Sequence, residues 1–261
     1  MPTISIITPM FNAEKYIKKT ITSVLNQTFE DWELIIIDDN SSDKSCLVVE
    51  QFSINNKKIK LLRFSKNNGA AISRREAIKL ATGRYIAFLD SDDIWHESKL
   101  KIQLEFMRKN KVSFSYGDYY IFKDNILNKL GEFKAKHRVS FADICLSCDI
   151  GCLTVMIDRK KISDITIPLS PKEDLATWLT ILKDKNIIAQ KYPGTLAYYR
   201  ISENSLSANK IKEIKKQFYV LKKIANLNII KAIYCLSIYI LKGILKHYTK
   251  YNNLKKKSGD I

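Results

Sequence analysis

Three carboxylates stand within four residues at the end of the stretch GRYIAFLDSDD, residues 83–93. Asp90, Asp92 and Asp93 would repel one another, and burying such charges without a partner is costly, so a cation is the simplest remedy. Asp90 and Asp92 are two residues apart and supply the hard oxygen ligands that Mg²⁺ and Mn²⁺ prefer. A solvated acidic turn at the end of a strand explains the same residues, and this stretch alone leaves both interpretations open.

A second acidic pair, Asp38 and Asp39, follows another apolar run, WELIII, at residues 32–37. Between residues 3 and 93 such runs alternate with helical patterns in the order β-α-β-α-β-α-β. This alternation predicts a parallel sheet with right-handed crossovers and helices on both faces. Ligands bind outside the carboxyl ends of the strands in such sheets. We therefore expect the two acidic clusters at one edge of the sheet, which favours the metal site.

Hydrophobic periodicity and turn residues set the expected boundaries of the elements. Strands are predicted at residues 3–8, 32–37, 60–64, 85–89, 112–122, 152–157, 187–189 and 196–200. Helices are predicted at residues 12–27 with Asn12 as N-cap, then from the serines after Asp39 to about 52, and at 72–81, 98–110, 140–148, 175–182 and 207–251, the last with breaks near 226–228 and 243.

The size and charge of the chain bound its organisation and its partners. Its 261 residues suffice for one sizeable core, or for one domain plus an appendage. The net charge of +17 predicts anionic partners: nucleotides, phospholipid headgroups or nucleic acid. Because the positive charge concentrates toward the C-terminus, we expect a globular domain at 1–205 and a basic helical extension at 206–261. A nucleic-acid-binding face would interleave basic groups with aromatics, so no nucleic-acid partner is expected.

The helical extension is amphipathic. At 100° per residue one face carries Ile229, Ile233, Leu236, Ile240 and Ile244, and the opposite face carries Lys231, Lys242 and Lys246. Only ten uncharged residues separate Lys231 from Lys242, fewer than the ~20 that span a bilayer. The pattern is typical of a helix in an anionic membrane interface. A helix packed on the body with a solvated lysine face is the alternative.

The cysteines and the N-terminus indicate the compartment. Five cysteines, an odd number, argue against a disulfide framework and for the cytosol. Cys145, Cys148 and Cys152 have spacings that would suit zinc, but no nearby histidine completes a site, so we expect small buried residues. The N-terminal segment runs directly into a strand pattern and does not resemble a signal peptide.

Taken together, these segments resemble the family 2 glycosyltransferases, which have the GT-A fold. The resemblance lies in TPMFNAEKYI, SVLNQTFEDWELIIIDDNSSD, NNGAAISRREAI, GRYIAFLDSDDIW and PKEDLATWLTIL, which together cover roughly residues 3–184. Two further segments, IGCLTVMIDRKKI and LAYYRISENSLSANKIK, are similar to enzymes of teichuronic-acid, capsule and lipopolysaccharide biosynthesis. The resemblance implies an α/β fold with a Rossmann-like nucleotide-binding half and a mixed central sheet with helices on both faces.

The resemblance also implies a donor site. Pro9 and Phe11 would wall the nucleotide base, and Asp39 would accept a hydrogen bond from the uracil imide. Gly69 and Arg74 belong to a glycine–arginine segment near the nucleotide, where an arginine offsets the charge of the diphosphate.

Catalytic roles follow from two further motifs of the family. Asp90-Ser91-Asp92 resembles the DXD motif, in which Asp92 binds a divalent ion, Mn²⁺ or Mg²⁺, while Asp90 faces the ribose or the metal's waters and Ser91 lies beside the donor. Asp174 matches the general base of the ED motif, and Glu173 lies on the acceptor side. One base without a nucleophile on the donor side implies single displacement and inversion.

The resulting prediction is an inverting, metal-dependent glycosyltransferase. It would move a sugar from a nucleotide-sugar, with UDP favoured by Asp39, to a hydroxyl of a growing surface polysaccharide or lipid-linked oligosaccharide. The basic tail would place the enzyme in the cytoplasm, on the inner face of a bacterial plasma membrane. One alternative is a metal-dependent nucleotidyl or phosphoryl transferase, although the sequence contains no phosphate-binding loop ending in Gly-Lys-Ser/Thr. The other is a basic nucleic-acid-binding protein.

Overall fold

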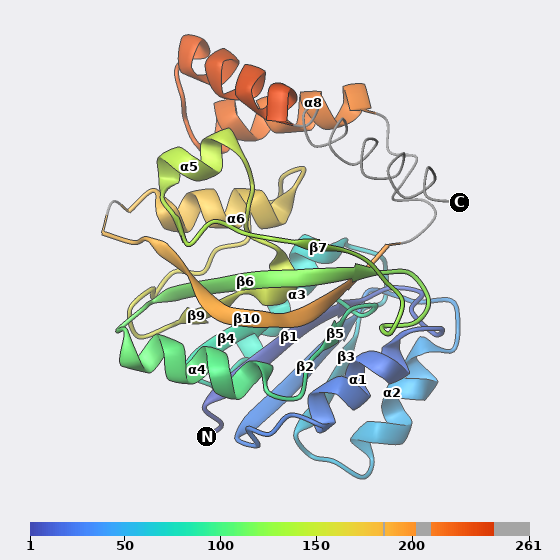
Figure 1. Cartoon of the computed structure of the whole chain (residues 1–261). Coiled ribbons are helices and arrows are strands. Elements are labelled where there is room, and N and C mark those ends of the chain that lie inside the picture. Colours follow the sequence, from blue (N-terminus) through green and yellow to red (C-terminus); the bar gives the residue numbers. More distant parts are fainter. Residues whose placement is uncertain (185, 202–209, 243–261) are drawn as a thin grey trace, which may run out of the picture.

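Four parallel strands form the N-terminal half of a ten-stranded sheet in the computed structural model, which describes residues 1–184, 186–201 and 210–242 (Figure 1). These strands are β1 (Ile4–Met10), β2 (Trp32–Asp38), β3 (Ile59–Arg63) and β4 (Tyr85–Phe88), in the spatial order β3-β2-β1-β4. They are connected by α1 (Ile17–Leu25), α2 (Ser45–Ser53) and α3 (Ala70–Leu80). The predicted alternation and the parallel pairing are confirmed.

The first helix begins later than predicted. Asn12 is not an N-cap: its φ is +49°, and its Oδ1 accepts a hydrogen bond of 2.9 Å from the Ser42 N–H. Asparagine tolerates this left-handed conformation because its short polar side chain bonds locally. Asn12 therefore joins the loops after β1 and β2, and α1 starts only at Ile17.

The C-terminal half makes the sheet mixed, as predicted. Antiparallel to β4 lies β9 (Met156–Asp158), followed in space by β6 (Phe114–Phe122), β10 (Ala189–Arg200) and β5 (Ile94–Trp95). Off this path, β7 (Lys129–Phe133) pairs with β6, and β8 (Arg138–Val139) pairs with β10. The sequence pattern gave no sign of β5, β7 or β8.

Three predicted strands in this half were wrong in detail. The run 152–157 is a 3₁₀ turn, η1 (Cys152–Thr154), followed by the short β9. The run 196–200 and Ala189, the last residue of the run 187–189, belong to one strand, β10, whose pairing with β6 shifts register between Lys191 and Thr195. Pro193 and Gly194 are residues that usually end a strand, and Gly194 has φ +86°. Here the strand continues through them with an irregularity in its pairing.

Apolar side chains fill both sides of the sheet. Along β1 and β2 the side chains alternate between two buried clusters, one beneath α3, α5 (Phe141–Leu146) and α6 (Glu173–Leu182), the other beneath α1, α2 and α4 (Lys99–Lys109). Trp178 of α6 packs on Phe88 of β4 and on Phe114 of β6, with ring centroids 5.5 and 5.3 Å away. This contact fixes the start of α6 relative to the loop that follows β4.

A C-terminal helical layer covers α5 and α6 (Figure 1). It consists of α8 (Lys210–Tyr219), the π-helical η2 (Val220–Ile224) and a helix over 229–242. Val220, Leu221, Ala232 and Cys235 are buried in the same cluster as Trp178. The predicted break near 226–228 is confirmed, whereas the break at 243 and the domain boundary at 205/206 lie outside the described residues.

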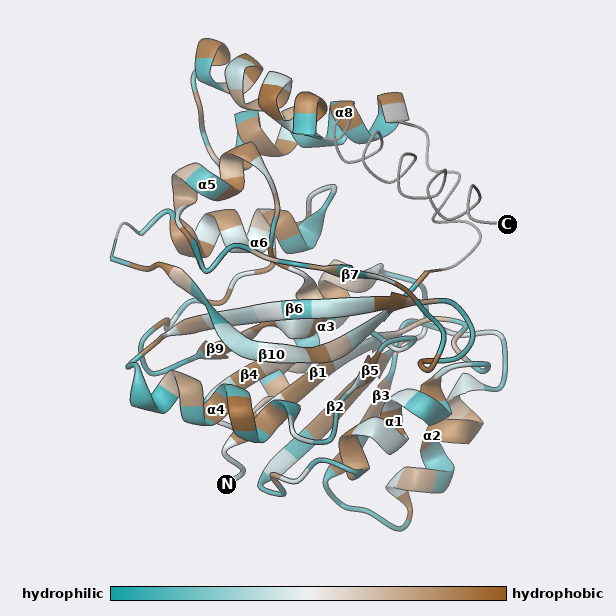
Figure 2. Cartoon of the chain, viewed as in Figure 1, coloured by the Kyte–Doolittle hydropathy of each residue, from teal (hydrophilic) through white to brown (hydrophobic). Residues whose placement is uncertain are grey.

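The helix over 229–242 has two unlike faces. Ala232 and Cys235 pack on the body, whereas Ile230 and Ile233 are 77% and 52% exposed. Figure 2 shows hydrophobic colour on this layer as well as on the buried strands. The alternative of a helix packed on the body is therefore confirmed for one face of this helix, and the other face is exposed. In the described part of the chain no helix has the length and hydropathy to cross a membrane.

Candidate active site

A pocket of about 320 Å³ lies at the carboxyl edge of the parallel strands. Its walls bring together most of the residues predicted for the donor and the metal: Pro9, Phe11, Asp39, Arg74, Asp90, Ser91 and Asp92. Phe11 is half exposed, so one face of its ring is available for stacking. The predicted convergence of the loops after β1, β2 and β4 is confirmed by this shared pocket.

Asp39 is oriented by the backbone of the loop before α3. Its carboxylate accepts hydrogen bonds from the N–H groups of Asn68 at 2.7 Å and Gly69 at 2.8 Å. Gly69 has φ +88°, a conformation that other residues adopt only with strain. A carboxylate has about four lone-pair sites, so Asp39 can still accept a hydrogen bond from a donor in the pocket. Gly69 thus acts through Asp39 and is not itself part of the pocket wall.

The two acidic clusters each contain one structural member. Asp38 is fully buried, accepts a hydrogen bond from the Ser41 N–H at 3.2 Å and forms an ion pair with Arg63 at 3.3 Å. Asp93 is also buried, and its carboxylate accepts a hydrogen bond of 2.8 Å from the backbone N–H of Arg200. Only Asp39, Asp90 and Asp92 among these acids face the pocket.

Asp90 and Asp92 suit a divalent cation shared with a phosphate ligand. Burial, followed by the charge of Asp90, raises the pKa of Asp92 to about 6, and the charge of Arg200 offsets this only in part. Within the described ranges, no cluster of three or more acidic, histidine or cysteine side chains could hold a metal. Mg²⁺ is commonly bound by one or two carboxylates plus substrate phosphates, and this pair meets that requirement.

Arg74 connects the donor pocket to a second cleft. Its guanidinium donates hydrogen bonds to Asp90 Oδ1 at 2.6 Å and to Glu173 Oε1 at 2.8 Å, and its side chain is only 8% exposed. The sequence predicted Arg74 beside a diphosphate but did not indicate that it would join the Asp90 loop to the start of α6. Two carboxylates compensate this buried cation and fix its plane.

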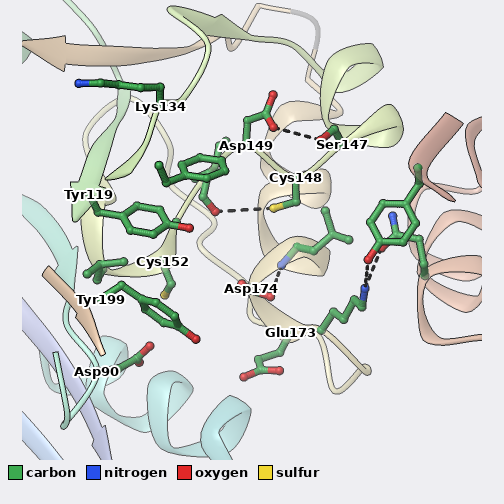
Figure 3. A pocket seen from close by; sticks show the side chains of 18 of the residues that line it. Asp90, Tyr119, Lys134, Ser147, Cys148, Asp149, Cys152, Glu173, Asp174 and Tyr199 are labelled. Carbon is green, nitrogen blue, oxygen red and sulfur yellow. Dashed lines mark hydrogen bonds between the residues drawn. The ribbon is translucent and has the colours of Figure 1, made fainter. Parts of the chain in front are cut away.

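The second cleft, of about 880 Å³, lies between the sheet, α6 and the C-terminal layer (Figure 3). Glu173 and Asp174 face it from the first turn of α6, with Asp90 and Tyr199 at one side. Burial raises the pKa of Asp174, although the Leu175 N–H donates it a hydrogen bond of 2.7 Å. A carboxylate with a raised pKa is a stronger proton acceptor, which suits a general base.

Several residues of this cleft were missed by the sequence analysis. Tyr119 stacks on Phe133 with centroids 4.9 Å apart and meets the edge of Tyr199 at 5.8 Å, forming an aromatic wall. The wall is built from β6, β7 and β10, and the aromatic residues of β6 and of the segment LAYYR were the local signals for it. The prediction of small buried residues is confirmed for Cys145, whereas Cys148 and Cys152 are half-buried and line the cleft.

Arg200 was also missed, although it supports the DXD loop. It is buried at the end of β10, and its Nε donates a hydrogen bond of 2.9 Å to the Asp92 carbonyl. Its guanidinium lies over the rings of Tyr16 and Phe122, at 4.5 and 4.3 Å. The available signal in the sequence was the position of Arg200 directly after the two tyrosines of the segment LAYYR.

Comparison with known proteins gives a consistent result. Residues 5–145 match the sequence profile of the family described as "Glycosyl transferase family 2". An Escherichia coli protein, "UDP-Glc:alpha-D-GlcNAc-diphosphoundecaprenol beta-1,3-glucosyltransferase WfgD", is 45% identical over 97% of this chain and 98% of its own. The "Putative teichuronic acid biosynthesis glycosyltransferase TuaG" of Bacillus subtilis is 39% identical over 94% of this chain and 97% of its own.

Solved structures share the fold. Residues 1–349 of Staphylococcus aureus TarS in complex with UDP-GlcNAc superpose with a TM-score of 0.67 at 22% identity, covering 92% of this chain and 71% of that one. A mannosyltransferase from Pyrobaculum calidifontis in complex with GDP-Man and Mn²⁺ gives a TM-score of 0.65 at 15% identity, covering 94% and 75%. At these identities the likeness concerns the fold alone.

Replacing Arg74 with lysine tests the bridge. Lysine keeps the charge but lacks the planar fork, so one carboxylate loses its partner in a partly desolvated site. We expect Arg74→Lys to lower the free energy of unfolding by about 2 kcal/mol, measured by urea denaturation. Arg108→Lys, an exposed cation on α4, should change it by less than about 0.5 kcal/mol. Equal effects of the two substitutions would contradict a structural bridge.

Proposed function

Because the chain belongs to glycosyl transferase family 2, we propose that it transfers glucose from UDP-glucose, with inversion, to a sugar hydroxyl of a lipid-diphosphate-linked acceptor. The observation that carries this proposal is the junction at Arg74, where the donor pocket with Asp90 and Asp92 meets the cleft with Asp174. The sugar and acceptor named here come from the similar E. coli proteins WfgD and WfaP, 45% and 40% identical.

The donor pocket supplies groups for each part of a nucleoside diphosphate. Pro9 and Phe11 form the wall against which the base packs, and Asp39 accepts a hydrogen bond from the uracil imide. Asp92, with Asp90, would hold Mn²⁺ or Mg²⁺, which stabilises the negative charge that grows on the diphosphate leaving group. Ser91 lies between these two carboxylates and contacts the donor.

The cleft supplies the acceptor side. Asp174 takes the proton from the attacking hydroxyl, and Glu173, held by Arg74, lies beside it and orients the acceptor. The hydroxyl attacks the anomeric carbon from the face opposite the diphosphate. A single base and a single displacement give inversion, which agrees with the β linkage in the name of WfgD.

Calorimetric titration with UDP tests the donor site. UDP should bind in the presence of Mn²⁺, and Asp92→Asn should weaken this binding by at least about tenfold because a carboxylate ligand is lost. Asp124→Asn, on an exposed loop outside the pocket, serves as the control. Binding of UDP that neither needs Mn²⁺ nor depends on Asp92 would refute the metal site, and failure to bind UDP at all would refute the donor.

The pH dependence of turnover tests the base. Asp174 must be deprotonated to accept a proton, so kcat/KM should fall as the pH drops through its pKa, which lies above that of an ordinary aspartate. Asp174→Asn should remove this acidic limb together with roughly 10²–10⁴ of the rate. Asp164→Asn, an exposed carboxylate outside the cleft, should retain both. An acidic limb that survives in Asp174→Asn would assign the base to another group.

The C-terminal layer has the surface properties expected of an enzyme that binds to the cytoplasmic face of a membrane. Beyond its packed side, the helix over 229–242 exposes Ile229, Ile230, Ile233, Tyr234 and Leu241. Such a contiguous apolar surface is uncommon on a soluble face and is typical of an interaction site. The excess of lysine toward the C-terminus adds attraction to anionic headgroups, so a lipid surface is the partner that fits both properties.

Vesicle flotation tests this membrane contact. The double variant Ile230→Asp/Ile233→Asp should reduce binding to phosphatidylglycerol-containing vesicles at least about tenfold, since burying one isoleucine side chain contributes about 1.5–3 kcal/mol. Ile54→Asp is the matched control, because Ile54 is 80% exposed at the end of α2, on the other side of the sheet. Equal losses in the two proteins, or no loss, would exclude this face as the contact.

A further inference from the structure

The part of the cleft that faces the C-terminal layer is polar. We propose that it binds the diphosphate that links the acceptor sugar to its lipid. The inference rests on the proposed function, because it assumes a lipid-diphosphate acceptor. The groups that would hold this diphosphate are Lys172, Gln217, Tyr239 and Lys242, all of which line the cleft.

Gln217 provides a donor without a partner. Its side chain is 1% exposed, and its Oε1 accepts a hydrogen bond of 3.1 Å from Lys172 Nζ. Its Nε2, by contrast, is buried and has no hydrogen-bond partner among the described residues. A buried amide left unsatisfied is costly, so such groups are rare unless a ligand or water completes them. A phosphate oxygen in the cleft would accept from this amide.

Two lysines provide the charge. Lys172 Nζ lies 3.2 Å from the Tyr239 hydroxyl and 3.4 Å from Glu213, which also pairs with Lys216, so its charge is only partly compensated. The Lys242 ammonium group makes no hydrogen bond or ion pair with any other described residue. A diphosphate diester is anionic on both phosphates, and ammonium groups, an amide N–H and a phenol O–H are the donors that bind it.

The order of these groups along the cleft matches the order of parts in such an acceptor. Asp174 and Glu173 stand where the attacking hydroxyl must be, and Lys172, the preceding residue, adopts a left-handed conformation with φ +55° that turns its side chain toward the C-terminal layer. The sugar would therefore occupy the space beside the base, with the diphosphate at Lys172 and Lys242.

The lipid then has an exit. Lys242 lies on the helix over 229–242, whose outer face carries exposed Ile230 and Leu241. A chain leaving the diphosphate at this helix passes directly to the apolar face proposed to contact the membrane. The donor's own diphosphate cannot be the ligand here, because the donor pocket lies on the other side of the Arg74 bridge.

A pair of soluble acceptor analogues tests the site. The octyl diphosphate ester of α-N-acetylglucosamine and the octyl α-glycoside of the same sugar differ only in the diphosphate. Binding is measured by calorimetry on the full chain saturated with UDP and Mn²⁺. We expect the wild type to bind the diphosphate ester at least about tenfold more tightly than the glycoside, and Lys242→Gln to remove most of this preference. Affinity for the glycoside should stay unchanged in the variant.

Lys231→Gln is the matched control, since Lys231 is exposed on the same helix outside the cleft and should leave the preference intact. Inorganic pyrophosphate serves as a competitor: displacement of the diphosphate ester, but not of the glycoside, supports the site. Equal affinity for the two analogues in the wild type overturns the inference, as does an equal loss for both in Lys242→Gln. Either of these two outcomes could occur with UDP binding intact. Failure of the inference is therefore distinguishable from failure of the proposed function, in which UDP does not bind.

Discussion

A buried arginine between two carboxylates is the constraint on which the site depends. Arg74 lies in α3, Asp90 follows β4, and Glu173 begins α6, so three elements meet at one guanidinium. Leaving any of these charges unpaired would be costly, which ties their relative positions together. Arg74 therefore sets the distance between the donor pocket and the second cleft. The proposed sugar transfer requires that distance to be fixed.

The two halves of the sheet support the two sides of this junction. The parallel half directs the loops after β1, β2 and β4 to one edge, where the donor pocket forms. The other half contributes β6, β7 and β10, whose aromatic side chains wall the cleft. Arg200, at the end of β10, donates a hydrogen bond to the Asp92 carbonyl, so the second half of the sheet supports the Asp90–Asp92 loop of the first.

The parts that the sequence predicted are those with local causes. Continuous apolar runs identified β1, β2 and β4, and the rule for parallel sheets placed Asp39, Asp90 and Asp92 at one edge. The family resemblance, which the comparisons confirm, supplied Asp174 as a candidate. The Arg74–Glu173 bridge joins residues 99 positions apart, and no local pattern encodes such a pairing. Similarly, Pro193 and Gly194 concealed the continuity of β10, because their local preferences were overridden by pairing with β6.

The C-terminal layer shows why charge and hydropathy patterns of a helix have to be assigned face by face. In the helix over 229–242 the small residues Ala232 and Cys235 are buried against the body, with Leu236 partly buried beside them, whereas Ile230, Ile233 and Leu241 are exposed. Isoleucines on the packed face would bury more apolar area than alanine and cysteine do. The exposed position of the isoleucines is therefore costly unless another surface covers them. Lys242 lies between these two faces and borders the cleft. A lipid-linked substrate has the same arrangement, with an anionic group between a sugar and an apolar chain, and the layer is complementary to it in that order.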